Sequence, residues 1–203
     1  MSRALRDASG ARARRAPDAW PGVPAPAARV AFSCPAPADA AEFLRAADAS
    51  RGRFAGFADV PLDPRAYRAW CQRARSPRAA GFLLRLRDRG QLVGALGLNR
   101  IEPAPLPRAT LSCYGFAATA GRGLVSEGVQ QLVAWAAAAL GLREIAADAR
   151  PENAASLALL RRCGFEPLEA PARLLRVGGA WHLHERWQLR AGNGPQPGSW
   201  GSA

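Results

Sequence analysis

Two short segments decide the fold of this chain: GRGLV at residues 121–125, and PENAAS at residues 151–156, which CGF follows at residues 163–165. The first is a glycine-bearing turn that opens a helix, so its free backbone N–H groups lie at the positive end of the helix dipole and can bind phosphate. The second is another helix start about 30 residues later, and its Asn and Ser would offer polar groups to the same ligand. The sequence therefore predicts a site for a phosphate-bearing ligand between two helix starts.

The composition indicates a single globular domain. A chain of 203 residues suits one α/β domain that buries a substantial core. It has no apolar run of the roughly 18 residues that a membrane span requires, and its N-terminus lacks the apolar stretch of a secretory signal. Four cysteines without CxxC spacing are typical of small core side chains in a reducing compartment, so we expect a cytoplasmic protein. Two histidines, His182 and His184, do not make a zinc site, and we expect no metal.

The charge is strongly positive. The formal net charge is +12, and all 28 basic residues are arginine. This usage is typical of a GC-rich bacterial genome, which explains arginine in place of lysine but not the positive excess. A basic surface attracts polyanions such as nucleic acid, the ribosome or the phosphates of a cofactor. General electrostatics and a specific acidic partner both remain open.

The chain divides into a domain and two tails. Residues 1–28 are rich in Arg, Pro and Ala, and residues 191–203 in Gly, Pro and Ser, so both are predicted to be disordered. Residues 29–190 alternate between the two periodicities. Strands are predicted at 29–33, 81–87, 91–100, 110–116, 144–149, about 165–177 and 180–189; helices at 39–49, from 64 through 70, 124–140 and 153–163.

This order of elements resembles the GNAT acetyltransferases, and within them the ribosomal-protein alanine N-acetyltransferases. The resemblance covers about residues 30–189, is strongest at 114–165, and includes the closing hairpin GGAWHLHE at 178–185. It implies an α/β (α+β) GNAT fold, with a mixed, mostly antiparallel central sheet of about seven strands flanked by helices. It also implies an acyltransferase that uses acetyl-CoA as cosubstrate. The sequence departs from the family pattern at Ala120, Val125, Ala146 and Leu183.

The resemblance assigns cofactor contacts to particular positions. Backbone near the end of the strand at 110–116 would hold the acetyl oxygen, the loop amides would hold the diphosphate, and Asn153 would lie against the pantetheine arm. The implied cofactor-binding residues are Phe116, Ala117, Gly121, Arg122, Gly123, Leu124, Val125, Asn153 and Ser156. The residues also permit simpler interpretations: Asn153 is a good N-cap, and Arg122 suits a solvated charge.

Three side chains are candidates for catalysis. The resemblance makes Ser156 the group that protonates the leaving thiolate or donates a hydrogen bond to it, although a serine in a first helical turn is often only solvated. Asp148 lies five residues before Asn153, the spacing of a catalytic Glu in some relatives, but an ion pair with an arginine would explain it equally well. Glu127 lies in a first helical turn, where the dipole favours a carboxylate whatever the function.

The basicity of the acceptor favours an α-amine. An α-amino group with a pKa of about 7.7–8.0 is roughly a quarter neutral near pH 7.4, whereas a lysine at about 10.4 is about 0.1% neutral. This difference corresponds to about 3 kcal/mol in the free energy of deprotonation. A site without a clearly specified strong base is therefore better matched to a protein N-terminus than to a lysine side chain.

Three functions remain open from the sequence alone. The first is acetylation of a protein N-terminus, with ribosome association as a further possibility. The second is acetylation of a small amine such as an antibiotic or a polyamine, although a cationic acceptor would prefer an acidic cleft. The third is a catalytically weak, basic binding module on the same scaffold. No membrane partner is expected, and either a monomer or a homodimer is compatible with the sequence.

Overall fold

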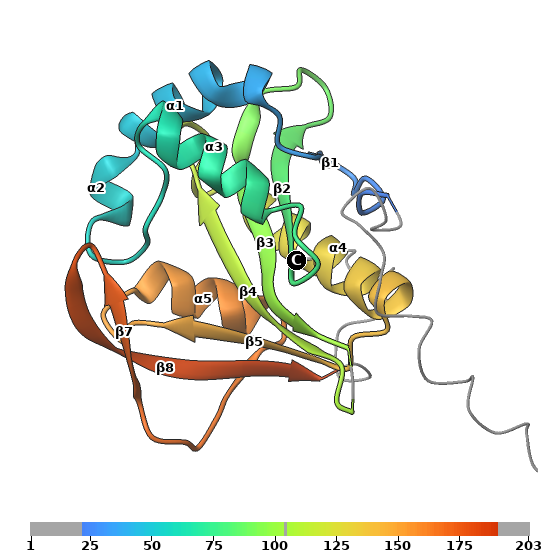
Figure 1. Cartoon of the computed structure of the whole chain (residues 1–203), viewed down its shortest axis with the longest axis vertical. Coiled ribbons are helices and arrows are strands. Elements are labelled where there is room, and N and C mark those ends of the chain that lie inside the picture. Colours follow the sequence, from blue (N-terminus) through green and yellow to red (C-terminus); the bar gives the residue numbers. More distant parts are fainter. Residues whose placement is uncertain (1–21, 104, 191–203) are drawn as a thin grey trace, which may run out of the picture.

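The computed structural model describes residues 22–103 and 105–190, so the tail predicted at 191–203 and most of that predicted at 1–28 lie outside the described residues. Within the described part, eight strands form a sheet that is flanked by helices (Figure 1), which confirms the predicted mixed fold. The strands are β1 (Val30–Ser33), β2 (Ala79–Leu86), β3 (Leu92–Glu102), β4 (Arg108–Gly115), β5 (Glu144–Ala149), β6 (Glu166–Pro167), β7 (Arg173–Val177) and β8 (Ala180–Arg190). The helices are η2 (Pro37–Asp39), α1 (Ala40–Asp48), α2 (Arg51–Phe54), α3 (Pro64–Arg73), η3 (Ala117–Thr119), α4 (Leu124–Leu140) and α5 (Ala154–Arg162).

The bounds of α4 and β5 agree with the prediction to the residue. Helix α4 lies between Gly123 and Gly141, whose φ angles of +72° and +66° are left-handed and suit only glycine without strain. The long strand expected at about 165–177 is instead divided into β6 and β7. Pro167 and Pro171 account for this break, because proline has no N–H to donate to a continuous ladder.

The sheet order is β1-β2-β3-β4-β5-β8-β6, with β7 paired to β8. All pairs are antiparallel except β4 with β5, which are parallel. Their pairing covers only residues 108–110 and 144–146, although β4 continues to Gly115 and β5 to Ala149. The two strands therefore part toward their carboxyl ends and leave a gap in the sheet (Figure 1).

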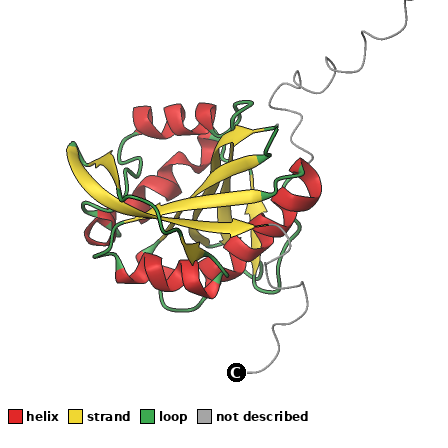
Figure 2. Cartoon of the chain, turned by 90° about the horizontal axis from the view of Figure 1, so that it is seen from below, coloured by secondary structure: helices red, strands yellow, loops and turns green. Residues whose placement is uncertain are grey.

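Helices cover both faces of the sheet (Figure 2), and each face has its own core. Helices α4 and α5 cover the larger core, which includes Leu96, Leu132 and Trp187. Helix α4 approaches closely at Gly128, where an added Cβ would lie 2.7 Å from Leu84 Cδ2. Helices α1 and α3 cover the second core, which is rich in aromatic rings such as Phe43.

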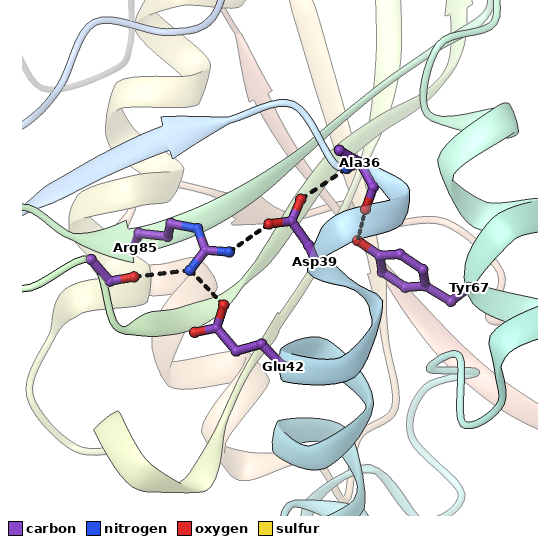
Figure 3. A network of polar contacts seen from close by, with 6 residues as sticks. Ala36, Asp39, Glu42, Tyr67 and Arg85 are labelled. Carbon is purple, nitrogen blue, oxygen red and sulfur yellow. Dashed lines mark hydrogen bonds and ion pairs between the residues drawn. The ribbon is translucent and has the colours of Figure 1, made fainter.

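A polar network fixes helices α1 and α3 on the sheet (Figure 3). The half-buried Arg85 guanidinium of β2 donates to Asp39 at 2.9 Å and to Glu42 at 2.8 Å. Asp39 also accepts from the backbone N–H of Ala36, and the carbonyl of Ala36 accepts from the Tyr67 hydroxyl of α3 at 3.1 Å. These contacts join both helices to β2.

Candidate active site

A cavity of about 720 Å³ is lined by the parted ends of β4 and β5 and by residues from both faces of the sheet. Side chains alternate along a strand, so the two cores identify the faces. Ala147 and Ala149 belong to the core under α4 and α5, and Asp148 between them therefore lies on the opposite face. On the α5 face the lining includes residues 121–126, Asn153 and Ser156; on the other it includes Phe54, Phe57, Arg100, Tyr114, Asp148, Leu175 and His184. The cavity thus passes through the sheet.

The loop before α4 presents backbone donors to this cavity. Gly121 and Gly123 have φ angles of +76° and +72°, which turn the chain into the helix. The first amide of the helix with a backbone partner is that of Glu127, which donates to Gly123 O at 3.1 Å; within the described residues, no backbone partner is seen for the amides of residues 121–126. Donors of this kind at a helix N-terminus fit a diphosphate.

Glu127 supports this loop from outside the cavity. Its carboxylate accepts from the backbone N–H of Arg29 at 2.6 Å and from Arg29 Nε at 2.8 Å. The same guanidinium donates through Nη1 to the carbonyl of Arg122 at 3.1 Å. Glu127 is not among the residues that line the cavity, whereas Arg122 is. The structure therefore places Glu127 where it holds the loop, away from the reacting groups.

Two of the backbone amides expected near the acetyl oxygen have partners elsewhere. The Phe116 amide donates to Val93 O at 2.9 Å, and the Ala117 amide to Ser50 Oγ at 2.9 Å. Hydrogen-bonded and non-hydrogen-bonded pairs alternate along an antiparallel ladder. Since Phe116 bonds to β3, the amides of Cys113 and Gly115 point the other way, toward β5, at the level where β5 has moved away. These two amides are the donors that the strand offers to an oxyanion.

Asn153 and Ser156 lie together at the start of α5. Asn153 Oδ1 accepts from the backbone N–H of Ser156 at 3.1 Å, so Asn153 is the N-cap of this helix. Both residues are half-buried and line the cavity on its α5 face. The cap therefore orients the first turn of α5, and with it the Ser156 hydroxyl, beside the gap.

Asp148 is the buried charge of the opposite face. Its side chain is only 8% exposed, with Arg186 Nη1 at 3.4 Å from Oδ1 and Arg173 Nη1 at 3.6 Å from Oδ2. Burial raises the pKa of Asp148 above its ordinary value, and the charges of Arg173, His184 and Arg100 only partly oppose this. Asp148 is thus ion-paired and also part of the cavity wall, and its catalytic role stays a prediction.

His184 is a site residue that sequence analysis did not identify. Trp187 and Leu189 of β8 belong to the core under α4 and α5, so alternation places His184 and Arg186 on the same face as Asp148. The imidazole is 4% exposed and lines the cavity, and its Nδ1 lies 2.9 Å from the carbonyl of His182. The HxH pattern showed that both rings share a face, but not which face this is.

The cavity is lined by more positive than negative charge. Five arginines and two aspartates line it: Arg53, Arg100, Arg122, Arg150, Arg162, Asp59 and Asp148. Three contacts hold the rim of the Asp148 face in place. Arg150 donates to Gly56 O at 2.7 Å and lies over the Phe57 ring, while Asp59 accepts from the backbone N–H of Gly178 at the tip of the β7–β8 hairpin. The loop after α2 and this hairpin therefore meet across the cavity.

Residues 22–103 and 105–190 hold neither a candidate metal cluster nor a candidate membrane span. In this part of the chain no cluster of three or more His, Cys, Asp or Glu side chains is arranged to hold a metal ion. None of its helices is long and apolar enough to cross a membrane.

Known proteins resemble this chain in sequence and in fold. Residues 29–166 match the family described as Acetyltransferase (GNAT) domain. The probable N-acetyltransferase YjcK of Bacillus subtilis is 27% identical over 95 residues, which are 47% of this chain and 52% of that protein. The match thus spans about half the length of this curated relative.

Two solved structures have the same fold. Mycobacterium smegmatis RimJ, in complex with CoA-disulfide, has a TM-score of 0.75 at 25% identity and covers 86% of this chain and 87% of its own. The acetyltransferase of Salmonella typhimurium that modifies the N-terminal serine of 50S ribosomal subunit protein L7/L12 has a TM-score of 0.74 at 16% identity. That match covers 84% of this chain and 99% of the other.

Proposed function

Since this chain belongs to the GNAT acetyltransferase family, and is therefore an acyltransferase, we propose that it moves an acetyl group from acetyl-CoA to the α-amine of a protein N-terminus. The observation that carries this proposal is the cavity through the gap between β4 and β5. It has unpartnered amides on one face of the sheet and a buried aspartate on the other. A thioester laid through the gap would present its carbonyl to an amine that enters from the second face.

The chain's own residues divide the work between the two faces. The amides of residues 121–125 and the Arg122 guanidinium would hold the diphosphate. Asn153 would line the path of the pantetheine arm, whereas the Phe116 ring is buried in the aromatic core under α1 and α3. The amides of Cys113 and Gly115 would donate to the carbonyl oxygen as it becomes an oxyanion. Ser156 would donate its hydroxyl hydrogen to the sulfur that leaves.

Asp148 would serve the acceptor face. A protein N-terminus enters as an ammonium group, because its pKa of about 7.7–8.0 lies above neutral pH. A buried carboxylate beside the thioester attracts this charge and stabilises positive charge while the amine loses its proton. The nearby arginines limit this attraction, because their positive charges surround the same carboxylate.

The charge of the cavity wall supports a peptide acceptor over a polycation. Five arginines against two aspartates would repel a polyamine, which carries several positive charges, more strongly than a peptide that carries one at its N-terminus. The structural neighbour from Salmonella typhimurium, which modifies the N-terminal serine of a ribosomal protein, supports the same class of acceptor. We further propose that the protein works in the cytoplasm, where ribosome association would suit its net charge of +12.

The first experiment is calorimetric titration of the intact protein with acetyl-CoA. We expect saturable binding, and the absence of heat or stabilisation at millimolar ligand would overturn the proposal. The second follows thiol release from acetyl-CoA with a panel of N-terminal peptides beside spermidine and a lysine-containing peptide with a blocked N-terminus. Turnover of free N-termini alone is expected. Preferred turnover of spermidine would establish the small-amine alternative, and nucleic-acid binding at low salt without any turnover would establish the binding module.

A further inference from the structure

The tautomer of His184 follows from the one hydrogen bond that its ring makes within the described residues. Nδ1 lies 2.9 Å from the carbonyl oxygen of His182, and a carbonyl oxygen can only accept. The proton of the neutral ring is therefore on Nδ1, and Nε2 carries the lone pair. Nε2 has no hydrogen-bond partner among the described residues. It is not one of the fully buried polar atoms without a partner, so part of its surface is accessible. Since the ring lines the cavity, Nε2 is the nitrogen that contacts the cavity's accessible surface.

The groups around this imidazole come from four strands. Asp148 of β5 lies close enough for the charges of His184 and Arg173 to act on it. Arg173 of β7 lies directly opposite His184 in the β7–β8 ladder, and Arg186 lies two residues further along β8 on the same face. Arg100 of β3 completes the set, because its charge also acts on Asp148. With a φ of +52°, Arg100 is the one non-glycine residue with positive φ in the described part of the chain.

The two carboxylate oxygens of Asp148 each face an arginine, whereas Nε2 of His184 has no such competitor. Ordinary basicities also favour the imidazole. The pKa of an ordinary imidazole lies about 1.2 to 1.5 pH units below that of an α-ammonium group, and the pKa of an ordinary carboxyl group about 4 pH units below it. Proton transfer from the acceptor to an imidazole is therefore less uphill than transfer to a carboxylate. The nearby carboxylate would stabilise the imidazolium that forms and oppose the repulsion from Arg100, Arg173 and Arg186.

We propose that His184 is a catalytic residue whose Nε2 takes the proton of the incoming α-ammonium group, with Asp148 as the positioning residue that stabilises the resulting charge. This assignment rests on the proposed function. The ammonium N–H bond breaks and its proton moves to Nε2, which leaves a neutral amine. The amine nitrogen bonds to the acetyl carbon, the carbon–sulfur bond breaks, and the sulfur keeps that electron pair. A second proton of the nitrogen reaches the sulfur by way of Ser156, and the imidazolium releases its proton to water.

Two variants test the assignment, because each preserves a different part of the ring. His184→Asn keeps an N–H near the position of Nδ1, so it can still donate to the His182 carbonyl. His184→Gln places an amide near the position of Nε2, but an amide takes no proton at neutral pH. His182→Gln is the control, since the His182 side chain does not line the cavity and its backbone carbonyl is retained.

The measurement is the pH profile of kcat/KM from pH 6 to 9 with a peptide that the wild type acetylates. Both His184 variants are expected to lose about ten-fold at pH 7, because an α-amine with a pKa of about 7.7–8.0 is only about a tenth to a sixth neutral there. They should regain most of it by pH 9, where the acceptor is already neutral, and should lose little with an N-terminal aminooxy peptide, whose nitrogen is neutral at pH 7. The His182 variant should stay within about three-fold of wild type, and calorimetry with acetyl-CoA should give unchanged affinity for all three proteins.

Two results would overturn the assignment: His184 variants with wild-type rates at pH 7, or a loss that is equal at pH 7 and 9 and equal with the aminooxy peptide. The second result would mean that the ring only supports the structure. A wild-type protein that acetylates none of the peptides overturns the proposed function, and this assignment with it. An active wild type with unaffected His184 variants overturns the assignment alone.

Discussion

The two mouths of the cavity are built from different parts of the polypeptide. On the α5 face the donors are mostly main-chain amides, in a loop whose shape depends on Gly121 and Gly123. On the opposite face the groups are side chains, Asp148, His184 and the arginines around them, brought together from β3, β5, β7 and β8. A mouth made of backbone suits a ligand that is always the same, and a mouth made of side chains suits an acceptor that differs between relatives. Substitutions on the two faces should therefore affect different steps.

The largest effect is expected at Gly123 on the backbone face. In Gly123→Ala, a left-handed residue acquires a Cβ, which costs about 1–2 kcal/mol, and the helix start can relieve this strain by turning its amides away. Loss of one charge-assisted hydrogen bond would weaken acetyl-CoA binding by about 10- to 100-fold. Calorimetric titration measures the affinity directly.

Gly141→Ala is the matched control, because Gly141 has a similar φ of +66° at the other end of α4 and does not line the cavity. Both variants should lose thermal stability, but only Gly123→Ala should lose affinity. Equal affinities in the two variants would mean that the loop amides do not bind the cofactor, and the assignment of the backbone face would be wrong.

The next effect concerns Ser156, which belongs to the α5 face but acts on the leaving group. Removing a hydroxyl that donates to the thiolate in Ser156→Ala should lower kcat about ten-fold, the value of one modest hydrogen bond. Acetyl-CoA affinity should stay near that of the wild type, because Asn153 Oδ1 still accepts from the backbone N–H at this position. Stopped-flow measurement of thiol release separates the two quantities. An unchanged kcat would remove Ser156 from the chemistry.

The backbone face was largely predictable from sequence, because its determinants are local. These determinants act within a few residues: a glycine before a helix, a proline and an asparagine at the next helix start, and a glycine at its end. Accordingly, α4 and β5 have the predicted bounds. The opposite face was not predictable in the same way. The Arg186 partner of Asp148 is 38 residues away. The backbone face has one such long-range pair too, because the Arg29 partner of Glu127 is 98 residues away. Such pairs depend on strand order and register, which no local pattern encodes.

The same distinction explains the backbone amides of Phe116 and Ala117. Both residues belong to the segment that the family resemblance places against the acetyl group, but their N–H groups donate to Val93 and Ser50. Which amides of β4 face the gap follows from its pairing with β3, and a single sequence does not give that phase. The location of the site was thus predictable from the sequence. Which amides serve as donors could be identified only from the hydrogen-bond pattern between β4 and β3.

A smaller effect, on stability, is expected at Asp148 on the side-chain face. Burial raises the pKa of Asp148, so the folded chain holds this proton more tightly than the unfolded chain. The stability linked to the proton is complete below the ordinary aspartate pKa and is lost as the pH rises through the folded value. The charged carboxylate therefore lowers stability at neutral pH. Asp148→Asn should unfold at an equal or higher temperature than wild type at pH 7, with an advantage that disappears toward pH 4.

Thermal unfolding followed by circular dichroism at several pH values measures this difference. A variant clearly less stable than wild type at pH 7 would mean that attraction to Arg173 and Arg186 outweighs burial. In that case the carboxylate would be a structural ion pair first.

The smallest effect is expected at Glu127. A substitution there distinguishes a role in supporting the loop from a role in the reaction. Glu127→Gln keeps an oxygen that can accept from the Arg29 backbone N–H but loses the charge of the ion pair, whose Arg29 side chain is 55% exposed. Because exposed pairs contribute about 0.2–1 kcal/mol, KM for acetyl-CoA should rise about two- to three-fold, with kcat unchanged. Steady-state kinetics with acetyl-CoA as the varied substrate distinguishes the two roles. A kcat lowered about 100-fold, as the loss of a proton-transfer group would produce, would instead place Glu127 in the reaction, and the backbone face would then hold a titrating group of its own.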